Sequence, residues 1–113
     1  MRQRRLIEIS IYLPLYCNPD PHTGKRRRIE RAKFEETYQE ILEKFEGYSL
    51  FQHVKGVWVD PTGRIVTDTH HVVFILTEET PQLEAWLQRY KQTLAMRFEQ
   101  QEIFMTMTQT RRI

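Results

Sequence analysis

Hydrophobic and polar residues alternate near the start of the chain, between Leu6 and Leu15. The apolar set consists of Ile7, Ile9, Ile11 and Leu13, and the intervening set consists of Glu8, Ser10 and Tyr12. A period of two places these sets on opposite faces of a strand. Pro14 limits the far end because it cannot donate a ladder hydrogen bond. The pattern predicts a strand with one face against a core.

Two later segments repeat their apolar residues every three or four positions, as amphipathic helices do. The first is predicted over Ile29 to Glu46, with Gly47 as the left-handed stop. Its solvent side is expected to hold Glu35, Glu36, Glu40 and Glu43. The second begins at Thr80-Pro81, where the hydroxyl is suited to cap the helix and proline to its first position. Its apolar stripe consists of Leu83, Trp86, Leu87, Tyr90, Leu94 and Phe98.

Three further segments are predicted to be strands. Residues 48–60 and 64–77 flank Asp60-Pro61-Thr62-Gly63, whose proline and glycine suit a tight hairpin. Val72 to Leu76 is continuously apolar, which indicates a central strand buried on both faces. After Gln100 the period returns to two, and Ile103, Met105 and Met107 predict a terminal strand.

The predicted order is therefore strand, helix, strand, strand, helix, strand. Right-handed crossovers at both helices place the first and third strands in the centre and the other two at the edges. We predict one α+β domain over residues 1–113 with the ferredoxin-like βαββαβ topology. Its four-stranded antiparallel sheet carries both helices on one face. Such a topology does not by itself fix a function.

Composition narrows the class of protein. The chain of 113 residues, with 40% hydrophobic and 28% charged residues, fits an ordinary globular domain. A formal net charge of +2 is too small for a polycation that coats nucleic acid. Cys17 is the only cysteine, which rules out an intramolecular disulfide and favours the cytoplasm. Glu8 and Ser10 interrupt the first apolar stretch, so we interpret it as a strand rather than a signal peptide or membrane span.

Short motifs from Lys44 onward resemble those of a group of small uncharacterised bacterial proteins. The motifs are Lys44-Phe45-Glu46-Gly47-Tyr48, Gly56-Val57-Trp58-Val59-Asp60, Tyr90-Lys91 and Phe98-Glu99-Gln100-Gln101. They share a glycine after the first helix, a Gly-x-Trp before the hairpin and a Phe-x-Gln near the last strand. The resemblance implies a ferredoxin-like or dimeric α+β barrel-type fold and dimerisation through the sheet. It implies no chemistry.

The sheet face that the helices leave open is the first candidate site. A half-apolar face of this kind is a large patch that soluble monomers avoid, so we expect a homodimer or higher homo-oligomer through this face or an edge. The residues expected to line a ligand cleft beside it are Ser10, Tyr12, His70 and Thr106. No catalytic residue, cofactor or metal is predicted.

Adjacent histidines in the third strand raise the question of a metal site. His70 and His71 leave opposite faces of the strand, so they do not grip one ion together. Asp68 and His70 share a face and could form an acid–base pair or two metal ligands, with His53 joining from the neighbouring strand. No His-x-x-x-His or Cys-x-x-Cys spacing supplies further ligands. Ordinary sheet histidines, one packed by a tyrosine, are the favoured interpretation.

The densest charge run is Lys25-Arg26-Arg27-Arg28, followed by Arg31 and Lys33. Such a run can hold phosphates of a nucleic acid, and Arg2, Arg4 and Arg5 would extend the patch. The central strands lack the aromatic signature of RNA-binding domains with this topology, and Glu8 would repel phosphate. The alternative is that the run solvates a loop and the start of a helix. Nucleic acid is therefore a disfavoured partner.

Three functions remain open. The first is a non-catalytic oligomeric domain that binds an unidentified protein or small molecule. The second is a small dimeric α+β barrel enzyme with a pocket between sheet and helices, where a Tyr or His does acid–base work. The third is a phosphate or nucleic-acid binder using Lys25 to Lys33. A nucleophile has little support, because Cys17 lies in a reachable loop without an activating base and Ser10 lacks a glycine-flanked elbow.

Overall fold

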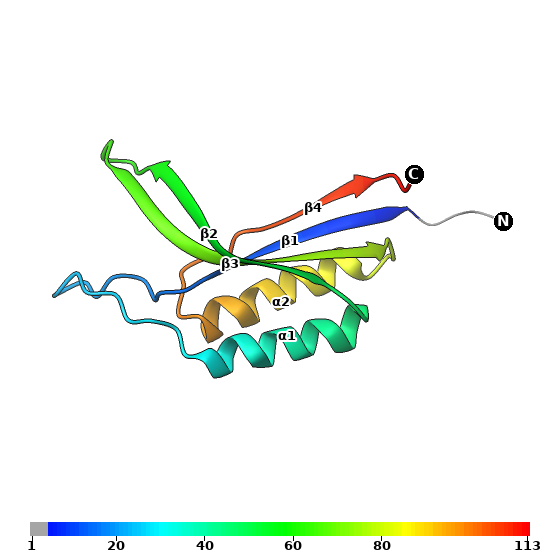
Figure 1. The fold of residues 1–113 in the computed structure, drawn as a ribbon, viewed down its shortest axis with the longest axis horizontal. Coiled ribbons are helices and arrows are strands. Elements are labelled where there is room, and N and C mark those ends of the chain that lie inside the picture. The colour runs from blue at the N-terminus through cyan, green and yellow to red at the C-terminus, as the bar shows by residue number, and fades with distance from the viewer. Residues whose placement is uncertain (1–4) are drawn as a thin grey trace.

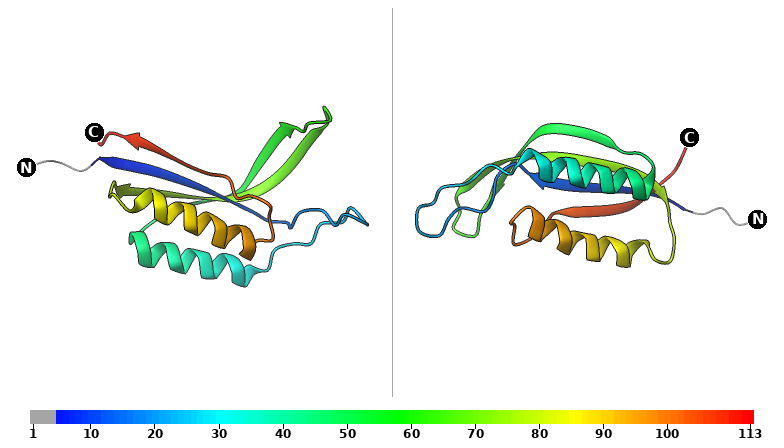
Figure 2. Two further views of the ribbon diagram at one scale, coloured as in Figure 1. Left: turned by 180° about the vertical axis from the view of Figure 1, so that it is seen from behind. Right: turned by 90° about the horizontal axis from the view of Figure 1, so that it is seen from below.

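The structure is a computed structural model that describes residues 5–113. Its elements are β1 (Leu6–Pro14), α1 (Arg31–Phe45), β2 (Ser49–Val59), β3 (Ile65–Glu78), α2 (Leu83–Arg97) and β4 (Met105–Thr110). The four antiparallel strands form one sheet in the order β2-β3-β1-β4. Both helices lie on one face of this sheet (Figure 1) and run alongside each other beneath it (Figure 2). The predicted ferredoxin-like α+β fold, with β1 and β3 in the centre, is confirmed.

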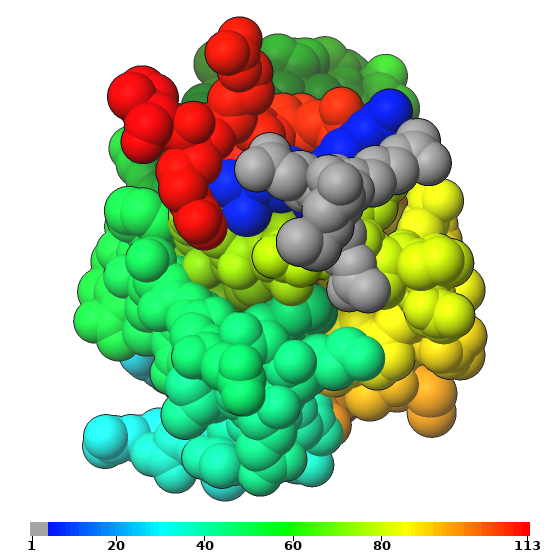
Figure 3. All heavy atoms as spheres, turned by 90° about the vertical axis from the view of Figure 1, so that its right-hand side faces the viewer, coloured from blue at the N-terminus to red at the C-terminus, as the bar shows by residue number. Residues whose placement is uncertain are grey.

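The core lies between the sheet and the helices, where the apolar positions of each element meet. The buried set from β1 is the predicted one: Ile7, Ile9, Ile11 and Leu13. Ile41 and Leu94 from the two helices are fully buried against the sheet, as is Phe98 just after α2. Removal of this apolar surface from water is the main favourable contribution to folding. Figure 3 looks along these layers from the end where β1 begins and β4 ends, with the helices below the strands.

The end of α1 and the start of α2 each differ from the prediction by a residue or more. Glu46, rather than Gly47, takes the left-handed conformation after α1, with φ 63°, and its N–H donates to the carbonyl of Leu42. At the other helix, Pro81 and Gln82 form a turn, and α2 begins at Leu83. Thr80 still contributes, because its carbonyl accepts a hydrogen bond from Leu83 N–H. The prediction of Thr80 as the side-chain cap of α2 is therefore wrong.

β3 is central, but only the face that the helices cover is buried all along its apolar stretch. Val73 and Ile75 face the helices and are fully buried. Val72 on the other face is also buried, whereas Leu76 on that face is 51% exposed. The prediction of burial on both faces is therefore correct only for part of the strand, because no helix covers the open face.

The hairpin of β2 and β3 extends well beyond the helices. We call residues 54–69 the arm; it projects from the same end of the molecule as the loop between β1 and α1 (Figure 1). Gly56 lets the indole of Trp58 lie over the strand, because an added Cβ would stand 3.3 Å from the indole ring. The radius of gyration is 15.8 Å, compared with about 13 Å expected for a compact domain of this length. Within residues 5–113, neither helix has the length and hydropathy needed to cross a lipid bilayer.

Candidate functional site

The four predicted ligand-contacting residues lie together on the open face of the sheet. Ser10 stands directly opposite Thr106 across the β1–β4 ladder. The ring of Tyr12 lies edge-on to His70, with centroids 5.9 Å apart, and edge-on to Phe104, with centroids 5.1 Å apart. Burial lowers the pKa of His70, although the Asp68 carboxylate opposes this shift. The arrangement is a mixed polar and aromatic strip rather than a cluster of hydrogen-bonded catalytic groups.

Asp68 pairs with a residue that no sequence pattern connects to it. Its carboxylate accepts a hydrogen bond from Arg26 Nη2 at 2.9 Å, and its side chain is largely buried. Arg26 also lies over the ring of Tyr16. Asp68 therefore anchors the loop before α1 to the arm. Among residues 5–113, no three His, Cys, Asp or Glu side chains are placed to hold one metal ion.

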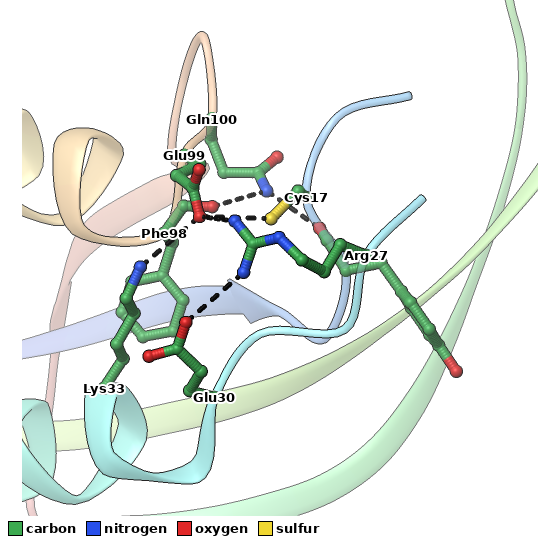
Figure 4. A network of polar contacts seen from close by, with 8 residues as sticks. Cys17, Arg27, Glu30, Lys33, Phe98, Glu99 and Gln100 are labelled. Atoms are coloured by element: carbon green, nitrogen blue, oxygen red, sulfur yellow. Dashed lines mark hydrogen bonds and ion pairs between the residues drawn. The ribbon is translucent and has the colours of Figure 1, made fainter. Parts of the chain in front are cut away.

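The basic segment is largely neutralised by carboxylates within the protein. Arg27 pairs with Glu30 and Glu99, Lys33 also contacts Glu99, and Arg31 pairs with Glu35. Figure 4 shows the first three of these contacts, of which the two with Glu99 meet at the turn after α2. Arg2 and Arg4 lie outside the described residues, and Arg5 precedes β1, a strand length of roughly 30 Å from the loop. Of the four cations in the run, Lys25 and Arg28 form no ion pair within the part of the chain that the structure describes.

Cys17 belongs to the same network and is buried, so the expectation of a reachable thiol is wrong. Its Sγ lies 3.4 Å from Glu99 Oε2 (Figure 4). Burial raises the pKa of the Cys17 thiol, and the hydrogen bond with Glu99 raises it further. Gln100 donates from Nε2 to the carbonyls of Tyr16 and Phe98, both at 2.9 Å. The Phe-x-Gln motif therefore joins the turn after α2 to the loop that follows β1, which is a structural role.

A second candidate site lies on the helix side of the sheet, at the base of the arm. It is a cavity of about 410 Å³ between the start of α1 and strands β2 and β3. The side chains on which its chemistry depends are Arg28, Arg31, Phe34, Tyr38, His53 and His71. The sequence predicted that one histidine packs against a tyrosine, and the structure shows two such pairs: Tyr12 with His70 on the open face, and Tyr38 with His71 in this cavity. In the cavity pair, His71 Nδ1 and Tyr38 OH are 3.0 Å apart.

Burial sets the protonation of this pair. It lowers the pKa of His71, with smaller contributions from His53 and Arg28. It also raises the pKa of Tyr38 to about 12, with an added contribution from Tyr48. Both groups are therefore neutral near pH 7. His71 Nε2 is buried and has no hydrogen-bond partner among residues 5–113.

A β-bulge shapes the cavity wall opposite His71. Phe51 pairs with Val72 and Val54 with His70, so Gln52 and His53 together face His71. His53 adopts φ 56°, a left-handed conformation that histidine tolerates better than most residues. Its ring lies edge-on to His71, with centroids 5.1 Å apart. Sequence reasoning missed the bulge, although the adjacent polar pair of Gln52 and His53 interrupts the apolar residues of the strand.

Comparisons with known proteins identify a family and a fold. A solved structure of a phage SAM lyase in complex with S-methyl-5′-thioadenosine superposes with a TM-score of 0.64 at 14% identity, covering 96% of this chain and 84% of that one. At this identity the likeness supports the fold alone. No curated protein matches the chain. Residues 15–112 match the model of a family described as "Protein of unknown function (DUF3574)". The chain therefore belongs to this family of proteins of unknown function, as its resemblance to an uncharacterised group implied.

Proposed function

We propose that the protein is a homo-oligomeric binding module in which a second copy covers the arm and the open sheet face. The observation that carries this proposal is an aliphatic surface on one side of the arm. Val57, Val59 and Ile65 are 59%, 65% and 75% exposed, respectively. Apolar patches of this kind on soluble proteins commonly mark contacts with a partner.

The three aliphatic side chains share one side of the arm because of the hairpin register. Val59 lies directly opposite Ile65, and Val57 is two residues before Val59. Side chains two apart on a strand, and those directly opposite on an antiparallel neighbour, point to the same face. This face continues the side of the sheet that the helices cover elsewhere. The arm extends past the helices, so the aliphatic surface has no cover within residues 5–113.

The open face of the sheet supplies a second apolar surface. Phe51, Leu76 and Phe104 are 54%, 51% and 61% exposed there. A twofold contact presents both surfaces of each subunit to the other. Each side chain buried there therefore contributes to the free energy of association once from each subunit. Burying an aliphatic or phenylalanine side chain contributes roughly 1.5–3 kcal/mol relative to full exposure. A second copy of the chain is therefore the partner whose surface complements this one.

The other two functions have weaker support. Internal ion pairs engage Arg26 and Arg27, which leaves little of the basic segment for the phosphates of a nucleic acid. The enzyme alternative rests on a fold neighbour named as a lyase and on the cavity beside His71. A likeness of fold alone carries no reaction to this chain. Both the cavity and the exposed surfaces therefore support a binding role, which assumes no particular reaction.

Light scattering coupled to size-exclusion chromatography tests the proposal. The wild type is expected to elute as a dimer or larger species, and the double variant Val59→Glu, Ile65→Glu as a folded monomer. Met96→Glu is the matched control, because Met96 is a highly exposed apolar residue that belongs to α2 and not to the arm or the sheet. The control is expected to keep the wild-type mass. A monomeric wild type, or a double variant that stays oligomeric, would contradict the proposal.

A further inference from the structure

We infer that the cavity at the base of the arm is a binding site for a small planar organic anion, held by Arg28 and His71. The cavity volume of about 410 Å³ lies within the roughly 300–1,000 Å³ common for small-molecule sites. This inference does not depend on the proposed oligomer, because Arg28 and His71 lie outside the aliphatic surface of the arm.

Aromatic rings form much of the cavity wall. Phe34 packs against both His71 and Tyr38, with ring centroids 5.0 Å and 6.3 Å away, respectively. Tyr38 in turn stacks on Tyr48, with centroids 5.8 Å apart. Aromatic rings prefer offset or edge-on contact with other rings. A flat ligand therefore matches this wall better than a branched one does.

Arg28 supplies the positive charge at the cavity. It forms no ion pair with any other residue of the described range 5–113, in contrast to its neighbours Arg26 and Arg27. Its backbone is held in place by a bridge to Tyr16. The N–H of the next residue, Ile29, donates to the carbonyl of Leu15 at 2.7 Å. A guanidinium on a fixed backbone suits a carboxylate or phosphate, which it binds through two parallel hydrogen bonds.

The other two charged residues at the cavity are paired with each other and therefore do not supply the charge that an anion needs. Arg31 and Glu35 pair with each other at 3.0 Å, and both side chains are mostly exposed. An exposed helical pair of this kind is weak and leaves no net charge. The local charge of the cavity is therefore positive.

His71 supplies an unused donor. In the tautomer in which Tyr38 OH donates to Nδ1, the neutral imidazole carries its proton on Nε2, the atom without a partner in the described residues. Buried side-chain nitrogen atoms without a partner are uncommon in proteins, and each calls for an explanation. An anionic oxygen is an acceptor that would satisfy this N–H. Arg28 and His71 then provide two donors for one anionic group.

His53 is the cavity side chain best placed to regulate access to that donor. Its ring lies edge-on to His71 and its own side chain is exposed, so we expect a rotamer change of His53 to open Nε2 to the cavity. The bulge and the left-handed φ place His53 in this position. Bulges are common beside functional sites, where they redirect a side chain, and backbone strain in proteins concentrates at ligand sites.

Binding of an anion is expected to be linked to proton uptake. The groups that face His71 are Tyr38 from α1, His53 from β2 and Arg28 from the loop, and none of them is an anion near neutral pH. An anion beside the imidazole favours its protonated form, so the pKa of His71 rises on binding. By linkage, the affinity then increases as the pH falls through the range where His71 titrates.

The experiment uses phenyl phosphate as the probe, followed by calorimetry and by NMR of the histidine ring signals. The wild type is expected to bind phenyl phosphate more tightly at pH 6 than at pH 8, with the His71 signals shifting on binding. Inorganic phosphate, which lacks the ring, is expected to bind more weakly. Benzyl alcohol, which lacks the charge, is expected not to bind measurably.

Two charge-removing variants separate a specific site from general attraction. Arg28→Gln is expected to weaken phenyl phosphate binding by about tenfold or more, as the loss of a charge-assisted pair does. Lys25→Gln is the matched control, since it removes one charge from the same run outside the cavity, and it is expected to leave the affinity within about twofold. Equal losses in the two variants would overturn the inference, as would binding that leaves the His71 signals unchanged or no binding at all. Circular dichroism confirms that both variants fold.

Discussion

Arg97 on α2 holds the carboxylate of Glu40 on α1 through two hydrogen bonds, Nη1–Oε1 at 2.7 Å and Nη2–Oε2 at 2.8 Å. The same Nη1 donates to the hydroxyl of Thr37, which is fully buried. Tyr90 OH donates to Glu40 Oε1 at 2.8 Å. Arg97 is only 12% exposed, so this contact is partly shielded from water. The two helices beneath the sheet are therefore joined by a polar clamp in addition to their apolar contacts.

Replacing Arg97 with lysine is expected to destabilise the fold by about 1–3 kcal/mol, because an ammonium group cannot reproduce the paired hydrogen bonds of the planar guanidinium. Urea unfolding followed by circular dichroism measures the change. Arg89→Lys is the matched control, since Arg89 lies on the same helix and is exposed. Equal stabilities for the two variants would show that the clamp contributes nothing specific.

The clamp also predicts an acid-dependent loss of stability. The hydrogen bonds from Arg97 lower the pKa of Glu40 below its ordinary value of 4.5, so the folded state binds fewer protons than the unfolded state in this range. The stabilisation is therefore fully present above about pH 4.5 and is lost as the pH falls through the folded-state pKa. Thermal unfolding between pH 7 and pH 3 measures it. Glu40→Gln lacks this titration, and an acid response in that variant as steep as in the wild type would contradict the assignment.

The architecture could be predicted because burial leaves a local imprint on the sequence. The isoleucines of β1 alternate because every second residue faces the helices, and this period of two is visible without knowing what covers them. The order of six elements then leaves few topologies. Glu46 shows the limit of this reasoning, because a glycine one residue later suggested a different stop. Local conformational preference locates the end of a helix only to within a residue or two.

The polar contacts between elements were harder to predict because they join residues far apart in the chain. Glu40 was assigned to the solvent side of its helix, and its partner Arg97 lies 57 residues away. Cys17 was expected to be accessible, and its partner Glu99 lies 82 residues away. The bulge at His53 is only weakly visible in the sequence. An inserted residue changes which face of the sheet the side chains point to, and it does so without requiring glycine or proline. Such pairings follow from the assembled fold and not from any local period.

Cys17 is predicted to be a slow thiol. Because burial and Glu99 raise its pKa, little thiolate forms near pH 8, and the sulfur is shielded as well. Its reaction with iodoacetamide, followed by mass spectrometry, is expected to be at least about tenfold slower in the folded protein than in urea. Glu99→Gln removes the carboxylate that raises the pKa, so it should accelerate the reaction while burial persists. Equal rates for folded and unfolded protein would show that the loop opens readily.

The backbone of His53 predicts an unusual ranking of two small substitutions. Its φ of 56° lies in the left-handed region, which glycine adopts without steric cost and alanine does not. Elsewhere in a strand, alanine is the more stabilising of the two. At this position His53→Gly is expected to be more stable than His53→Ala by about 1 kcal/mol.

Urea unfolding of both variants measures this difference, and the same exchange at an ordinary strand position provides the control. Lys55 suits that purpose because it is exposed in the same strand and pairs regularly with Thr69. There, Lys55→Ala is expected to be the more stable substitution. If alanine is favoured at both positions, the left-handed conformation of His53 does not persist in solution. The bulge would then not hold His53 over His71, and the access route proposed for the cavity would be lost.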